Sequence, residues 1–162
     1  MATTSQQRVL EILRKEVDCA GELLDVLHRE QEALGQRDAD TVEGVVTEKQ
    51  AVIGRLEELQ GERLGLMDEG GYTRDSEGMA ALVVAAPEAL SADLDNAWQD
   101  FEERLQRCQE QNQVNGQVLE SSIRQTRQAL SILVGGGATE SGLYNRDGAK
   151  TGPTGTRSYA KV

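Results

Sequence analysis

Residues 9–34 read VLEILRKEVDCAGELLDVLHREQEAL, and this segment carries the strongest structural signal in the chain. Its apolar side chains recur at steps of three and four residues, a spacing that keeps one stripe of a helix facing a partner helix. The stripe comprises Leu10, Leu13, Val17, Ala20, Leu24, Leu27, Gln31 and Leu34, and it is widened by Val9, Ile12, Leu23 and Val26. We therefore predict a helix over residues 5–34 that contacts two neighbouring helices.

A second segment with the same spacing follows a short connection at residues 35–39. Gly35 is expected to end the first helix, and Asp40 with Glu43 resembles an N-cap and capping box for the second. The repeating positions of this segment are Val42, Val45, Lys49, Val52, Leu56, Leu59, Arg63 and Leu66. Because a five-residue connection is too short for parallel neighbours, the two helices should form an antiparallel hairpin.

Glycines interrupt the second helix, and each lowers helix stability by about 1 kcal/mol relative to alanine. Gly44, Gly54 and Gly61 either permit close approach of another helix or simply make this helix modestly stable.

Residues 68–78 lack periodicity and are expected to form a loop, and residues 79–86 have room for two helical turns before Pro87. A third long helix then begins at residue 87 or 91 and continues to residue 134. Its seam comprises Leu94, Trp98, Phe101, Leu105, Cys108, Asn112, Asn115, Leu119, Ser122, Thr126, Ala129 and Leu133. A helix of 44 residues is ~66 Å long, so the second helix, with about 27 residues, is too short to cover it.

The composition changes after residue 134. Residues 135–162 hold seven of the 17 glycines, with four basic and two acidic side chains. Such a segment buries too little apolar surface to offset its chain entropy. We therefore expect a helical bundle domain at 1–134 and a flexible Gly-rich tail at 135–162. The predicted fold is all-α, an elongated antiparallel three-helix bundle or coiled coil with a long overhanging third helix and a disordered C-terminal tail.

Charge and hydropathy exclude several classes of function. The formal net charge is −11, which disfavours nucleic acid as a partner because phosphate binding depends on lysine and arginine. Neither a run of about 20 apolar residues nor a signal-peptide core is present, so we expect no membrane insertion and a cytoplasmic location. Cys19 and Cys108 form no CxxC motif and are expected to be reduced core residues.

The sequence offers little catalytic chemistry. His28 is the single histidine, and it lies one residue off the apolar stripe of the first helix. General-base catalysis would require an oriented partner for it, and the familiar nucleotide, zinc and nucleophile motifs are missing. We predict a protein that is not an enzyme and that needs no cofactor or metal.

The most informative feature is a change within the third helix. Residues 88–110 carry seven acidic and two basic side chains, whereas residues 111–134 carry one acidic and two basic side chains. At the same place the seam becomes polar, and Asn112 and Asn115 are expected to face the turn between the first two helices. Beyond them lies an apolar stripe without a covering helix, formed by Val118, Leu119, Ile123, Leu130 and Leu133.

An uncovered apolar stripe of this size usually marks a partner site. It could bind a different protein, pair with a second copy of the chain, or be covered by the third helix folding back. A structural, homo-oligomeric coiled-coil scaffold is therefore the alternative to a binding protein.

These same residues resemble a known family. The segment Asn112-x-x-Asn115-Gly116, followed by Val118-Leu119, Ser121-Ser122-Ile123 and Ala129-Leu130, resembles the FlgN-type flagellar export chaperones. The Leu-rich first helix and the pair Glu48-Lys49 agree with this family, and Leu143-Tyr144-x-x-Asp147-Gly148 is similar to its C-terminal element.

The resemblance implies a cytosolic chaperone that binds the C-terminal amphipathic helix of the hook–filament junction subunits FlgK and FlgL. Such a chaperone prevents premature assembly of these hook-associated proteins and delivers them to the flagellar type III export apparatus. We predict that the client binds along the uncovered part of the third helix, at Asn112, Asn115, Val118, Leu119, Ile123, Leu130 and Leu133.

The tail carries a second candidate site. Leu143 and Tyr144 form an apolar pair in a Gly-rich segment, and an aromatic side chain supplies a large contact area with few rotors to order. By resemblance, Tyr144 docks at the export gate, and the basic residues nearby could steer it to an acidic surface. The alternative is a tail that serves only solubility.

Overall fold

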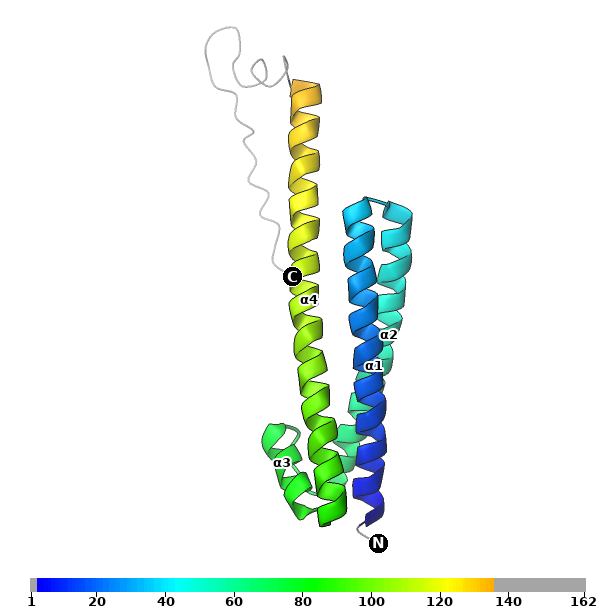
Figure 1. The fold of residues 1–162 in the computed structure, drawn as a ribbon, viewed down its shortest axis with the longest axis vertical. Coiled ribbons are helices and arrows are strands. Elements are labelled where there is room, and N and C mark those ends of the chain that lie inside the picture. Colours follow the sequence, from blue (N-terminus) through cyan, green and yellow to red (C-terminus); the bar gives the residue numbers. More distant parts are fainter. Residues whose placement is uncertain (1–2, 136–162) are drawn as a thin grey trace, which may run out of the picture. The chain divides into compact units, whose positions relative to one another are not determined.

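A computed structural model of the chain describes residues 3–135. This part forms four helices and contains no strand: α1 (Thr3–Gln36), α2 (Ala39–Glu69), α3 (Ser76–Ala85) and α4 (Glu88–Gly135) (Figure 1). The prediction of an all-α fold is confirmed. The predicted tail, including Leu143 and Tyr144, lies outside the described residues.

The chain divides into two units, and the boundary lies within α4. The first unit extends to Leu119 and contains α1, α2, α3 and most of α4, and the second begins at Glu120. The predicted domain boundary at residues 134 and 135 stays a prediction, because residues 136–162 are not described.

The α1–α2 connection is shorter than predicted, and its capping residues differ. Gly35 is still helical, and α1 ends at Gln36 because Arg37 adopts the left-handed conformation, with a φ of 56°. Asp38, rather than Asp40, is the N-cap of α2, and its carboxylate accepts a hydrogen bond from the backbone N–H of Thr41 at 3.3 Å. The predictions for Gly35 and Asp40 were therefore wrong by two positions.

The glycines of α2 have a simple explanation. A Cβ atom added at Gly44, Gly54 or Gly61 would meet no neighbouring atom within 4 Å. Close approach of another helix is therefore not the reason for these glycines, and their remaining effect is a lower helix propensity.

The short helix α3 is longer than two turns. Asp75 caps it by accepting a hydrogen bond from the Gly78 N–H at 2.9 Å, so α3 begins at Ser76 inside the predicted loop. Met79 and Leu82 on this helix are buried.

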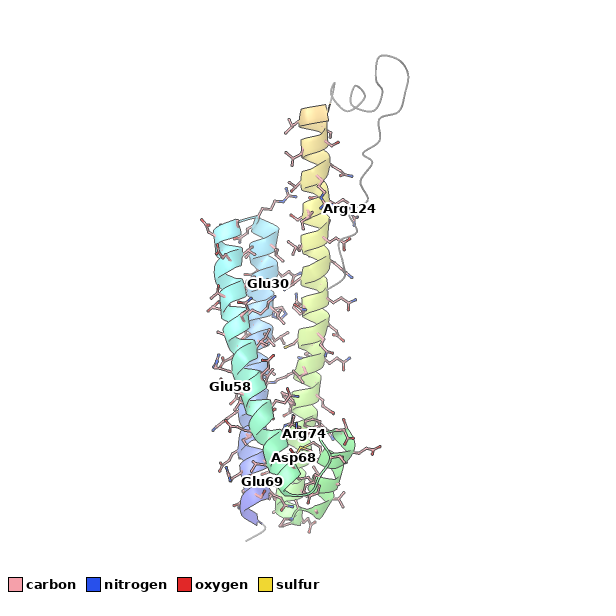
Figure 2. All side chains as sticks on the ribbon, turned by 180° about the vertical axis from the view of Figure 1, so that it is seen from behind. Glu30, Glu58, Asp68, Glu69, Arg74 and Arg124 are labelled. Carbon is pink, nitrogen blue, oxygen red and sulfur yellow. The ribbon has the colours of Figure 1, made fainter. Side chains whose placement is uncertain are left out.

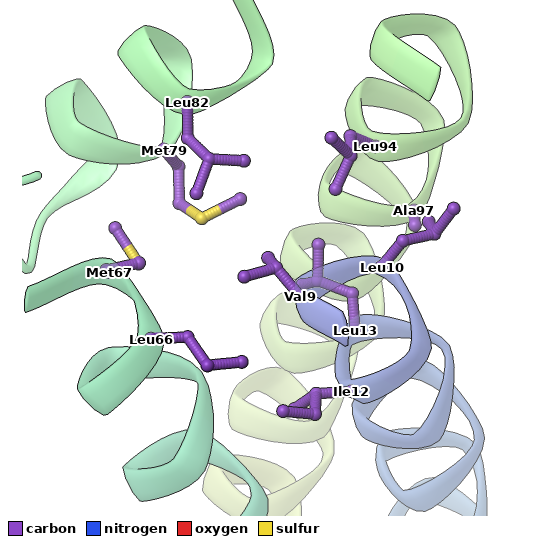
Figure 3. Close-up of a cluster of buried hydrophobic side chains, with 10 residues drawn as sticks. All are labelled: Val9, Leu10, Ile12, Leu13, Leu66, Met67, Met79, Leu82, Leu94 and Ala97. Carbon is purple, nitrogen blue, oxygen red and sulfur yellow. The ribbon is translucent and has the colours of Figure 1, made fainter. Parts of the chain in front are cut away.

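The first hydrophobic cluster combines side chains from all four helices (Figure 3). Its buried members are Val9, Leu10, Ile12, Leu13, Leu66, Met67, Met79, Leu82, Leu94 and Ala97. This cluster fixes the end of the first unit that contains the start of α1, the end of α2 and the start of α4.

A second cluster continues the core along the α1–α2 hairpin. Its buried members are Cys19, Leu23, Val26, Leu27, Val45, Val52 and Cys108. Both cysteines are free and buried, and burial raises the pKa of each thiol. Their predicted role as small core residues is confirmed.

Within the first unit, α4 runs parallel to α1. Side chains of α4 donate hydrogen bonds to three α1 carbonyls at a nearly constant sequence separation of 87 or 88 residues. These bonds are Arg104 to Val17 at 3.0 Å, Cys108 to Ala20 at 3.4 Å and Asn115 to Leu27 at 2.8 Å. The three contacts define the register of α4 on α1.

Candidate functional site

Four large aliphatic side chains of α4 are exposed on one face of the helix. Leu119 is 47% exposed, Ile123 45%, Leu130 54% and Leu133 82%. They follow one another at steps of four, seven and three residues, which places them in one stripe along a helix. We call Leu119, Ile123, Leu130 and Leu133 the apolar stripe. Val118 lies at its edge and is half-buried.

The two asparagines predicted for this site are separated by the structure. Asn112 is exposed, whereas Asn115 is buried with 2% of its surface exposed. Asn115 was predicted to face the turn between α1 and α2, but its amide instead donates to the Leu27 carbonyl within α1. Asn115 is therefore inaccessible to a partner in this state of the chain.

Asn115 belongs to a polar network that joins α1, α2 and α4. Its amide nitrogen also donates to Glu30 Oε1 at 3.0 Å, and Lys49 Nζ lies 2.6 Å from Glu30 Oε2. Gln111 Nε2 donates to Asn115 Oδ1 and to Gln31 Oε1, both at 2.9 Å. We call these five residues the Asn115 network; Figure 2 labels Glu30 among them.

The sequence did not lead us to predict this network, although a signal for it is present. Gln31 and Lys49 occupy seam positions at which the three-four spacing predicts apolar side chains. Polar residues at such positions commonly find partners across the seam and fix its register.

A second polar pair occupies the seam between the two hydrophobic clusters. Arg63 Nε donates to Glu16 Oε2 at 2.8 Å, and both side chains are buried. The guanidinium carbon lies 4.9 Å from the ring centroid of Trp98, within the range of a cation–π contact. Arg63 is likewise a seam position of the second predicted helix.

Two further exposed aliphatic residues of α4 were not predicted. Val114 and Ile132 are 18 residues apart, or five helical turns, so they share a face, and that face is well away from the apolar stripe. Val114 and Ile132 therefore offer exposed aliphatic positions on the same helix but outside the apolar stripe.

His28 is exposed, and no group of three or more His, Cys, Asp or Glu side chains within residues 3–135 is placed to hold a metal ion. A hollow of about 380 Å³ between α1 and α2 is lined mainly by charged side chains, including Glu22 and Arg55, whose charged atoms lie 2.6 Å apart. Glu58, labelled in Figure 2, is one of these charged side chains.

None of the helices within residues 3–135 is both long and apolar enough to serve as a transmembrane span.

Comparisons with known proteins connect this architecture to flagellum synthesis. The family model described as FlgN protein matches residues 1–152. The flagella synthesis proteins FlgN of Salmonella typhimurium and Salmonella typhi are each 27% identical to this chain over 143 residues, covering 87% of this chain and 89% of theirs.

A solved structure agrees with these relatives. The crystal structure of a flagella synthesis protein FlgN from Pseudomonas aeruginosa superimposes with a TM-score of 0.63 and is 26% identical in sequence. The match covers 68% of this chain and 85% of that protein.

Proposed function

Because the chain belongs to the FlgN family, we propose that it is a cytoplasmic export chaperone for the hook–filament junction subunits FlgK and FlgL. The family consists of flagellar export chaperones and not of enzymes, so a role in flagellum biogenesis follows from membership. The identity of the clients, the cytoplasmic location and the binding residues belong to the proposal.

The observation that carries the proposal is the apolar stripe of α4. An amphipathic client helix whose apolar face would otherwise self-assemble can be masked by laying that face along an exposed apolar helix surface. The row from Leu119 to Leu133 spans 15 residues, or about four helical turns, which suits an occupant of this kind.

The expected affinity suits a carrier. Burying four aliphatic side chains contributes about 1.5–3 kcal/mol each, or roughly 6–12 kcal/mol in total. Association costs about 4–15 kcal/mol in lost freedom, which leaves a modest surplus at best. A chaperone that must release its client at the export apparatus needs this reversibility.

The proposal is tested by charge substitution within the apolar stripe. Leu119→Asp with Ile123→Asp should abolish binding of a synthetic peptide containing the client's C-terminal helix, measured by titration calorimetry. Circular dichroism should show nearly unchanged helicity, because both side chains are exposed. Global unfolding of this variant would show that the stripe belongs to the core and would contradict the proposal.

The chain offers a matched control on the same helix. Val114→Asp with Ile132→Asp introduces the same charges at exposed aliphatic positions outside the stripe. This variant should bind the peptide as the wild type does.

A structural, homo-oligomeric coiled-coil scaffold is the second candidate, since the same stripe would fit a second copy of the chain. Light scattering across concentration, with and without the client peptide, separates the two functions. A tight dimer that persists in the presence of peptide, without peptide binding, would favour the scaffold.

The tail completes the proposed function. We place export-gate docking on Leu143 and Tyr144, on the strength of their resemblance to the family's C-terminal element. Client binding and docking would then use separate parts of the chain.

A further inference from the structure

The sequence of α4 is compatible with more than one alignment of this helix on α1, and the Asn115 network distinguishes between these alignments. The seam of α4 repeats every seven residues over its whole length, so the helix could slide by one heptad along α1 and still present a seam to the hairpin. In the slid register Leu119 would take the place of Asn112, and part of the apolar stripe would be used by the chain's own hairpin.

The observed contacts disfavour that slide. In the slid register Asn115 would take the place of Cys108, which belongs to the second hydrophobic cluster together with Leu23 and Leu27. Its carboxamide would then leave Glu30 Oε1 and enter a largely apolar environment, where an amide without full hydrogen bonding is costly.

The hydrogen bonds of the network form together only in the observed register of α4 on α1. Asn115 donates to two α1 groups, the Leu27 carbonyl and Glu30, and accepts from Gln111 on its own helix. Glu30 is held in turn by Lys49 of α2, with 5% of Glu30 exposed. One buried side chain of α4 thus contacts both α1 and, through Glu30, the far helix of the hairpin.

We propose that the Asn115 network is a register lock that keeps the apolar stripe available to the client. This role rests on the proposed function, because the lock protects that same site from being used by the chain's own hairpin. Asn115, Glu30 and Lys49 act as positioning residues: they set where α4 lies on α1 and have no contact with the client. Buried polar groups can select one arrangement without adding stability, so the lock and the stability of the bundle are separable.

The test removes the polar groups and measures the register directly. The variant Glu30→Met, Lys49→Met and Asn115→Leu replaces the network core with apolar side chains of similar length. Spin labels are attached at Arg8→Cys and Gln113→Cys, which are exposed positions on α1 and α4. The natural thiols are replaced by Cys19→Ser and Cys108→Ser, which keep the donors to the Val52 and Ala20 carbonyls.

Pulsed electron spin resonance should give one interspin distance for the chain with an intact network. The triple variant should show a second population that is shorter by about 10 Å, because seven residues of helix correspond to that rise. The same variant should remain folded, with a melting temperature equal to or above that of the parent, and should bind the client peptide at least tenfold more weakly.

Two controls sharpen the result. Arg29→Met with Glu48→Met removes an exposed α1–α2 ion pair of 2.6 Å and should change neither the distance nor the affinity. Glu30→Gln, which keeps an oxygen acceptor for Asn115, should also retain the parent distance and affinity.

A single unshifted distance in the triple variant would overturn the proposal. If the triple variant does not fold, Asn115→Leu alone takes its place in the distance measurement, and a single unshifted distance there would likewise overturn the proposal. Failure of the unmodified chain to bind the peptide would contradict the proposed function instead, and the distance measurement would still decide whether the lock exists.

Discussion

Arg63 on α2 donates a 2.8 Å hydrogen bond to Glu16 on α1, and neither residue is more than 3% exposed. The guanidinium of Arg63 also faces Trp98 and Phe101 of α4, with 4.9 and 5.8 Å between its central carbon and the ring centroids. One buried ion pair therefore lies where the three long helices meet. Burial of such a pair carries a desolvation cost that its attraction only partly offsets.

Removing one partner of this ion pair should lower the stability of the chain more than replacing both partners with apolar residues does. Glu16→Ala leaves the buried guanidinium without its counter-charge, and we expect the free energy of unfolding to fall by about 3–5 kcal/mol. Glu16→Leu with Arg63→Met removes both charges and should lie within about 1 kcal/mol of the wild type or above it. Urea denaturation measures both variants. Equal destabilisation of the two would show that the pair itself stabilises the bundle.

The same carboxylate predicts a pH dependence. Burial raises the pKa of Glu16 above its ordinary value of 4.5, against the opposing effect of Arg63. The folded chain thus holds this proton more tightly than the unfolded chain does, so the contribution of Glu16 to stability falls as the pH rises from 4.5 to the raised pKa.

Glu16→Gln isolates this contribution. The free energies of unfolding of the wild type and of Glu16→Gln are measured by urea denaturation from about pH 4 to about pH 8. The wild-type value minus the Glu16→Gln value should fall as the pH rises across that window. A difference that is independent of pH would contradict the raised pKa. Hydrogen bonds lower the pKa values of Asp38, Asp68 and Asp75, so the stability that these carboxylates contribute is present above their ordinary value of 3.8 and is lost only as the pH falls below it. This contribution is common to both proteins.

Two glycines should respond oppositely to alanine. Gly61→Ala places a Cβ in open space within α2 and should stabilise the chain by about 1 kcal/mol. Gly78→Ala would bring a Cβ into overlap with the Thr73 backbone carbonyl, and we expect it to destabilise the chain by about 1–3 kcal/mol. Thermal denaturation compares them, and a stabilising Gly78→Ala would show that the α2–α3 connection adjusts freely.

The tail should be separable from client binding. A chain truncated after Gly137, and Tyr144→Ala alone, should bind the client peptide with unchanged affinity while client export and motility fall. Export assays in a strain lacking the chain, complemented with each variant, measure this effect. Full export by the truncated chain would remove any role for Tyr144.

The helices and their pairing could be predicted from sequence because apolar spacing is a local pattern. The pairing of α1 with α2 was predicted from their short connection, and α3 from the room that residues 79–86 leave before Pro87. The errors lay at helix ends. Glycine is the usual residue at a helix end, which pointed to Gly35, but Arg37 adopts the left-handed conformation instead. Capping by Asp38 rather than Asp40 depends on which carboxylate reaches an N–H in three dimensions.

The candidate site was harder to predict, because burial of a polar residue depends on partners far away in sequence. Asn112 and Asn115 look equivalent on the seam of α4, yet only Asn115 meets Leu27 and Glu30. Because these partners are 85 to 88 residues apart in the sequence, a local sequence pattern cannot predict their contact. The exposed aliphatic row from Leu119 to Leu133, by contrast, could be predicted from its spacing together with the unequal lengths of the helices.

A map of where the client helix contacts the chain would test the role of the apolar stripe without any substitution. We would record amide hydrogen exchange of the full chain by mass spectrometry, with and without a peptide containing the C-terminal helix of FlgK. We predict that the peptide slows exchange in the segment at residues 118–133 and leaves the α1–α2 hairpin unchanged. Protection confined to the hairpin, or no protection anywhere at saturating peptide, would contradict the assignment of the apolar stripe as the client site.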